Sequence, residues 1–164
     1  MMILEFGKPA VCKLATLAPM QLFVHGKGSA LSTAIFIEGG QGALWLNLSG
    51  EAAFQFGEVK LVPGAGYNVL AMRPPTPLKV LVDPSSGVDP AKAAPGQLLI
   101  SGDYGPCIAG SWPKNDSETN SLSLQHGHVV EVTHPLFAFE SWSLGYEASD
   151  GGWVDIVSRE KPST

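Results

Sequence analysis

Cysteine is scarce in this sequence, and so are charged residues. Cys12 and Cys107 are the two cysteines among 164 residues, too few for a zinc knuckle or a disulfide framework. We therefore expect two free thiols, as in a reducing compartment. Charged residues make up 15% of the chain, and the net charge is −5. The sequence has no run of lysine and arginine, which argues against nonspecific binding to nucleic acid or to an anionic membrane.

Long apolar runs are missing as well. No stretch approaches the length that a membrane-spanning helix needs. Near the N-terminus, Glu5, Lys8 and Lys13 interrupt the apolar segment that a signal peptide would require. The sequence therefore predicts a cytoplasmic protein. Because apolar residues reach 45% while charge is low, we also expect another subunit to cover part of the surface, as in a homo-oligomer.

Helical periodicity is the third absence. Nineteen glycines and thirteen prolines separate short apolar runs, and many of these runs alternate with period two. Leu44, Leu46 and Leu48, for example, share one face of a strand. One helical turn is expected near 89–94, where Asp89 can cap it and Pro90 takes the first helical position. The pattern predicts a single all-β domain over 1–164, a sandwich or jelly-roll-like architecture.

An internal repeat is an open alternative within that domain. When the sequence is shifted by 63 residues, glycines and apolar residues coincide between 34–70 and 97–133. The shift pairs Gly64 with Gly127, both at expected turns. It predicts two similar β-units, 30–83 and 93–148, packed as one body.

The segment SLQHGHVVEVTHP, residues 123–135, contains three of the four histidines. On a continuous strand, His126, His128 and His134 would lie on one face. Imidazoles two positions apart suit a divalent transition metal such as zinc, copper, iron or nickel. A metal site built from these three histidines is therefore one interpretation.

This His-x-His pair resembles the metal motif of the cupin family of jelly-roll proteins. The Pro-Gly turn within 49–71 is similar to a second cupin element. The resemblance implies a metal-dependent jelly-roll enzyme. The sequence departs from the family pattern because Glu131 would face away from His126 and His128, and because the two elements occur in reversed order.

A turn is the competing interpretation of the same segment, and we favour it. The 63-residue shift places His126-Gly127 on Pro63-Gly64, and Pro-Gly is a strong turn signal. Gly127 would then take the positive φ of a tight turn. His126 and His128 would lie on either side of that turn, their rings pointing apart, and would not share a metal.

Residues for binding a small ligand are expected elsewhere. SGDYGPC, residues 101–107, places Asp103 and Tyr104 in a turn, and Trp112 begins the most polar segment of the chain, 112–121. Exposed aromatic rings can stack on sugars. Cys107 with a histidine and Asp103 could make a nucleophile and base. No positive charge or helix N-terminus is predicted nearby to lower the thiol pKa, so we expect a buried, inert thiol.

These observations favour a non-enzymatic β-sandwich binding or assembly module that self-associates and needs no cofactor. The first alternative is the cupin-like metal enzyme. The second is a domain that binds a carbohydrate or another small ligand. We assign no catalytic residue, and we take Asp103, Tyr104 and Trp112 as the candidates for ligand binding.

Overall fold

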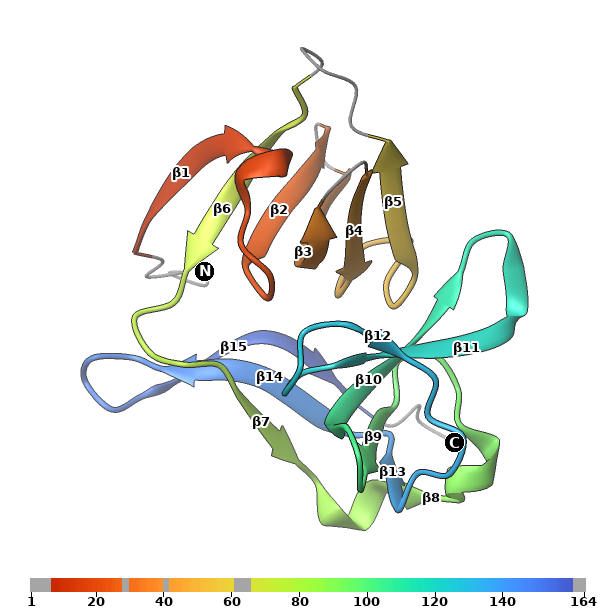
Figure 1. Ribbon diagram of the computed structural model, residues 1–164. Coiled ribbons are helices and arrows are strands. Elements are labelled where there is room, and N and C mark those ends of the chain that lie inside the picture. The colour runs from red at the N-terminus through yellow and green to blue at the C-terminus, as the bar shows by residue number, and fades with distance from the viewer. Residues whose placement is uncertain (1–6, 28–29, 40–41, 61–65, 161–164) are drawn as a thin grey trace.

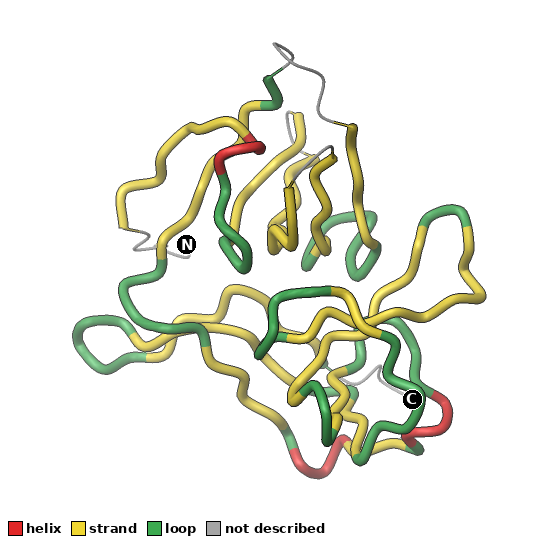
Figure 2. The backbone as a smooth tube through the Cα atoms, in the orientation of Figure 1, coloured by secondary structure: helices red, strands yellow, loops and turns green. Residues whose placement is uncertain are grey.

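The computed structural model describes residues 7–27, 30–39, 42–60 and 66–160, and it confirms the all-β prediction (Figures 1 and 2). The described residues form strands β1 to β15, three short 3-10 turns and no α-helix. The strands build three antiparallel sheets. The first sheet makes one layer, and the second and third sheets lie against it in a sandwich arrangement.

The first sheet has the strand order β1-β6-β2-β3-β4-β5. Its strands, in chain order, are Gly7–Lys13, Leu22–Lys27, Ala30–Gly39, Gly42–Asn47, Phe56–Lys60 and Asn68–Arg73. The chain runs as a meander from β2 to β5. It then returns across the sheet so that β6 lies between β1 and β2 (Figure 1).

The second sheet has the order β12-β11-β10-β9-β13-β8. Its strands, from β8 to β13, are Gly87–Val88, Leu98–Ser101, Gly105–Trp112, Asn115–Ser123, Val129–Val130 and Phe137–Phe139. The third sheet has the order β15-β14-β7, formed by Trp153–Arg159, Trp142–Glu147 and Lys79–Val82.

The main core fills the space between the first sheet and the other two. It contains alternate residues of the strands, because neighbouring side chains on a strand point to opposite faces. The first sheet contributes Leu22, Ile35, Ile37, Leu46, Leu48, Phe56 and Met72. The other two contribute Leu98, Ile108, Leu122, Trp142 and Leu144. All are nearly inaccessible to solvent. The remaining alternate residues of the first sheet therefore point to its opposite face, away from this core.

The first and second sheets repeat one topology. β1 to β6 and β8 to β13 occur in the same order across their sheets. The pairings agree in detail, since Leu22 lies opposite Ile35 in the first sheet and Leu98 lies opposite Ile108 in the second. The next strand continues the match, with Leu46 beside Ile35 and Leu122 beside Ile108.

The register of this match differs from the 63-residue shift. Leu22 and Leu98 are 76 positions apart, whereas Ile35 and Ile108 are 73 apart. Gly64 lies outside the described residues, so its equivalence with Gly127 stays a prediction. The unit boundaries 30–83 and 93–148 also stay a prediction. The matching strands begin earlier, at β1 and β8.

The predicted helical turn forms as a 3-10 turn, Pro90–Lys92. The carboxylate of Asp89 caps it by accepting a hydrogen bond from the N–H of Ala91 at 3.0 Å. Two similar turns, Leu14–Thr16 and Pro84–Ser86, are not evident from the sequence pattern. The polar segment 112–121 is a hairpin. β10 ends at Trp112 and β11 begins at Asn115.

Candidate ligand-binding cleft

The histidine segment forms the tight turn that the sequence predicts. Gly127 has a φ of 72°, and its N–H donates to the carbonyl of Ser123 at 2.8 Å between β11 and β12. The rings do not point apart as expected, because the centroids of His126 and His128 are 5.8 Å from each other. His134 is exposed beyond β12, with Nδ1 3.1 Å from the Thr133 hydroxyl.

A metal site at these histidines gains no support from the structure. Across residues 7–27, 30–39, 42–60 and 66–160, no group of three histidine, cysteine, aspartate or glutamate side chains is placed to hold a metal ion. His126 and His128 approach each other in the turn without a third such side chain beside them. The described residues therefore do not support the cupin-like alternative.

The three residues proposed for ligand binding lie at opposite ends of β10. Asp103 is exposed and Tyr104 is half-buried in the turn before this strand, where both N–H groups donate to the hydroxyl of Ser101 at 3.2 Å. Trp112 ends the strand, roughly 20 to 25 Å away at about 3.3 Å per residue. The structure therefore does not bring Trp112 together with Asp103 and Tyr104.

Trp112, which the sequence offered as a ligand-binding residue, makes packing and hydrogen-bond contacts within the fold. Its ring stacks on Phe56 with a centroid distance of 4.8 Å, at the edge of the main core. Its Nε1 donates to Oδ1 of Asn120 at 2.6 Å, on the neighbouring strand. The indole therefore holds the β10–β11 hairpin against the first sheet.

Cys107 is buried on β10, as expected for an inert thiol. Burial raises its pKa to about 11, although the hydroxyl of Ser123 partly opposes the shift. The thiolate is thus suppressed at neutral pH, which argues against nucleophilic chemistry. Cys12 and Cys107 are both free thiols.

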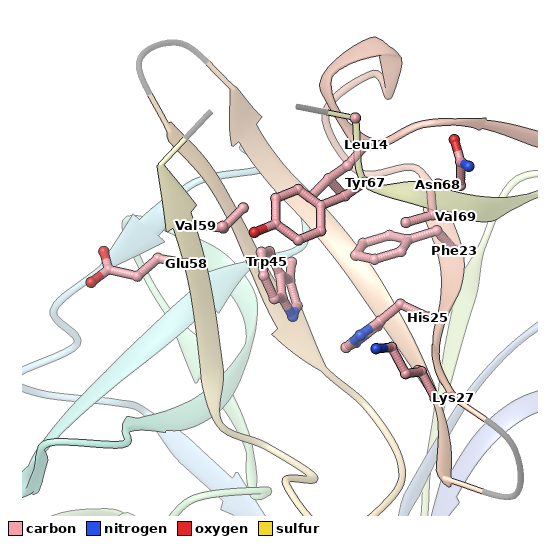
Figure 3. Close-up of a pocket in the computed structure, with 12 residues that line it drawn as sticks. Leu14, Phe23, His25, Lys27, Trp45, Glu58, Val59, Tyr67, Asn68 and Val69 are labelled. Carbon is pink, nitrogen blue, oxygen red and sulfur yellow. The ribbon is translucent and has the colours of Figure 1, made fainter. Parts of the chain in front are cut away.

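A cleft of about 600 Å³ lies on the face of the first sheet opposite the main core (Figure 3). This volume is within the range of sites for small organic ligands. Aromatic side chains from β2, from β4 and from the residue just before β6 line it, namely Phe23, His25, Trp45 and Tyr67. Aliphatic side chains complete its wall, namely Leu14, Val59 and Val69.

Three of these aromatic rings form one cluster. Phe23 and His25 alternate on β2 and therefore share a face, with centroids 5.4 Å apart. The indole of Trp45 meets both rings edge-on, at 6.2 Å from Phe23 and 5.6 Å from His25. Edge-to-face pairs of this kind are each worth about 0.5–1.5 kcal/mol beyond area burial, so the rings hold one another in place.

Asn47 holds the ring nitrogens of His25 and Trp45 in place. The residue is only 6% exposed, and its Nδ2 donates to the carbonyl of Gln55 at 3.0 Å. Its Oδ1 accepts from Nε1 of Trp45 at 3.2 Å and lies 2.9 Å from Nε2 of His25. An indole nitrogen can only donate, so Oδ1 is the acceptor for both rings. His25 must then carry its proton on Nε2.

Gly57 makes room for the indole. Trp45 and Gly57 lie opposite each other on β4 and β5, and a Cβ at residue 57 would overlap the Trp45 ring. The equivalent pair in the second sheet is Ser121 with Val130. The first sheet therefore pairs a large side chain on β4 with a glycine on β5. The other sheet combines a small residue with a branched one.

The same comparison extends to the other ring residues. The second sheet has Leu99 where the first has Phe23, and Ser101 where the first has His25. Leu99 and Val130 fill its equivalent face together with Cys107, Ala109 and Ala138. Because one topology forms with and without the aromatic cluster, the fold itself does not require these rings.

Sequence reasoning missed this cleft. The ligand-binding candidates from the sequence were Asp103, Tyr104 and Trp112, none of which lines it. A signal was present, since the period-two alternation that buries Leu46 and Leu48 sends Trp45 and Asn47 to the opposite face. What the pattern could not supply was the pairing of β2 and β4 with β3, which brings His25 to Asn47.

Comparison with known proteins assigns the chain to no group, because it matches no family model, no curated protein and no solved structure. The described residues contain no helix with the length and hydropathy needed to cross a membrane.

Proposed function

We propose that this protein is a non-enzymatic binding module that holds a small ring-shaped molecule in the aromatic cleft of the first sheet. The cluster of Phe23, His25 and Trp45, locked by Asn47, carries the proposal. A pre-formed, largely apolar cleft with a few fixed polar groups is the usual form of a small-ligand site. Pre-ordered rings also lower the entropy cost of binding.

The comparison between the sheets supports a functional role for the rings. The second sheet keeps the topology but has Leu99, Ser101 and Ser121 at the positions of Phe23, His25 and Trp45. The same strand order therefore forms in the second sheet without the aromatic rings. Tyr67, which is 52% exposed at the mouth of the cleft, adds a further ring against which a ligand can stack.

Fluorescence with the neutral aromatic probe N-phenyl-1-naphthylamine tests the proposal. We expect saturable binding, weakened at least about tenfold in the double variant Trp45→Ser/Gly57→Val, which places the residue pair of the second sheet in the first. Trp112→Phe, which changes an indole outside the cleft, serves as the control and should bind normally. Equal binding by the double variant and the unchanged protein would contradict the proposal.

We also propose that the module self-associates. β1 is an edge strand of the first sheet, and Val11 on it is 73% exposed. Unpaired edges that carry exposed β-branched residues favour pairing with another chain. A second copy that adds a strand to β1 would cover this edge.

A further inference from the structure

The charged groups around the cleft do not match the net charge of the chain. The protein carries a net charge of −5. Yet Lys27 lines the cleft at the end of β2, and the ammonium of Lys13 packs against Gly66, another lining residue. Glu58 is the one acidic side chain among the described lining residues. Two ammonium groups, one on Lys27 and one beside Gly66, therefore lie at the cleft against a single carboxylate, although the protein as a whole is acidic.

The polar and apolar parts of the cleft lie at different ends. Figure 3 shows His25 and Lys27 both extending from β2 in the direction of Trp45, whereas Leu14, Val59 and Tyr67 lie away from Lys27. The carboxylate of Glu58 points away from the aromatic cluster in the same view. A ligand with one apolar ring and one polar group would fit these two ends in a single orientation.

Lys27 is available for a ligand. In the described parts of the chain, the ion pair that forms joins Lys79 to Glu147, so Lys27 has no carboxylate partner there. Its neighbour His25 is already held by Asn47. An ammonium next to a fixed imidazole and an apolar wall suits a carboxylate, sulfonate or phosphate on a ring, because the ammonium is a point charge that binds such anions.

We infer that the ligand is an amphipathic organic anion, with an aromatic or aliphatic ring against Trp45 and Tyr67 and an anionic group beside Lys27. This inference rests on the proposed function and specifies its ligand class. The acidic protein repels anions in general. A preference for an anionic ligand must therefore arise locally, from Lys27 and Lys13.

Two probes that differ mainly in charge test the inference. 1-Anilinonaphthalene-8-sulfonate carries a sulfonate that N-phenyl-1-naphthylamine lacks. We expect the anionic probe to bind more tightly. Lys27→Gln should weaken it about five- to tenfold and leave the neutral probe within about twofold, since a charge-assisted contact is lost while the ring contacts remain. Raising salt from about 0.05 M to about 0.5 M should reduce binding of the anionic probe more than binding of the neutral one.

Lys92→Gln is the matched control, because Lys92 is exposed on the 3-10 turn of the second half, away from the cleft. An equal loss with Lys92→Gln would show nonspecific attraction and overturn the inference. Equal affinity for both probes, with no effect of Lys27→Gln, would also overturn the inference. It would leave the proposed binding of a ring-shaped molecule in the cleft intact. If neither probe depends on Trp45, the proposed function fails as well.

Discussion

The indole of Trp45 on β4 occupies the space that a side chain at Gly57, opposite it on β5, would fill. The two residues should therefore be energetically coupled. Trp45→Ser alone should destabilise the protein by about 2–4 kcal/mol through a lost ring and a cavity. Gly57→Val alone should cost about 1–3 kcal/mol through overpacking.

The double variant Trp45→Ser/Gly57→Val should be more stable than the sum of the single effects predicts, by about 1–3 kcal/mol. The reason is that the second sheet accommodates this pair as Ser121 and Val130. Urea unfolding of the four proteins measures the cycle. If the two single changes in unfolding free energy simply add, residues 45 and 57 are not coupled, which would contradict the prediction.

Asn47 should contribute to stability through its two ring partners. Asn47→Ala leaves the indole N–H of Trp45 and Nε2 of His25 without their acceptor, and we expect a loss of about 1–3 kcal/mol. Asn120→Ala is the control, because Asn120 also accepts from an indole but is only partly buried, so water can replace it. Its cost should stay below about 1 kcal/mol, and equal losses would contradict a special role for Asn47.

The turn at His126-Gly127-His128 should depend on its glycine. Gly127 has a φ of 72°, and a Cβ there would lie 3.0 Å from Cγ of Met20. Gly127→Ala should therefore destabilise by about 1 kcal/mol or more. Gly151 has a φ of 85° with open space around it, so Gly151→Ala isolates the backbone penalty and should cost less. Thermal unfolding compares the two, and the reverse ranking would contradict the contact with Met20.

Cys107 should make the protein sensitive to alkali. Its pKa is raised from 9.0 to about 11 in the native state, so the folded protein holds the thiol proton more tightly than the unfolded chain does. This contribution is complete below about pH 9 and is lost as the pH rises through about 11. Cys107→Ala should therefore lessen the fall in unfolding free energy over that window, by on the order of 1–2 kcal/mol.

Cys12→Ala is the control for the alkaline effect, because it removes the other free thiol and leaves Cys107 in place. In native protein at about pH 8, iodoacetamide should react with Cys12, which is half-buried, faster than with Cys107, which is buried with a suppressed thiolate. Faster alkylation of Cys107, read by peptide mass spectrometry, would run against this account.

Self-association through the β1 edge should raise the mass of the protein in solution. Light scattering should give a mass above the 17.3 kDa of one chain at micromolar concentrations, and most simply a dimer. Val11→Lys should shift the protein toward the monomer, because a charge on an edge strand opposes strand addition. Leu136→Lys changes a similarly exposed residue outside β1 and should have less effect. A monomer at every concentration would refute the proposal.

The internal match between the sheets shows how far sequence comparison could go. The two sheets align at Leu22 with Leu98 and at Ile35 with Ile108, but the separation changes from 76 to 73 residues between these positions. A shift without gaps cannot follow that change, because the equivalent strands differ in length: β2 extends from Leu22 to Lys27, whereas β9 ends at Ser101. Glycines at turns then produce a competing match at 63 residues.

The candidate site could not be predicted from the sequence for a related reason. Phe23 and His25 on β2, and Trp45 and Asn47 on β4, are recognisable as alternating residues, but alternation does not tell which strands become neighbours. The predicted site residues Asp103, Tyr104 and Trp112 were adjacent to polar segments, and β10 separates Trp112 from the other two.

The sequence by itself determined what depends on local rules. Period-two alternation and frequent glycine and proline set the all-β class, Asp89 and Pro90 set a capped turn, and Gly127 set the turn between the histidines. Tertiary structure alone decided which face of the first sheet became the cleft. That choice depends on strand pairing and on the packing of the second and third sheets against Leu46 and Leu48, which left Trp45, His25 and Asn47 together on the opposite face.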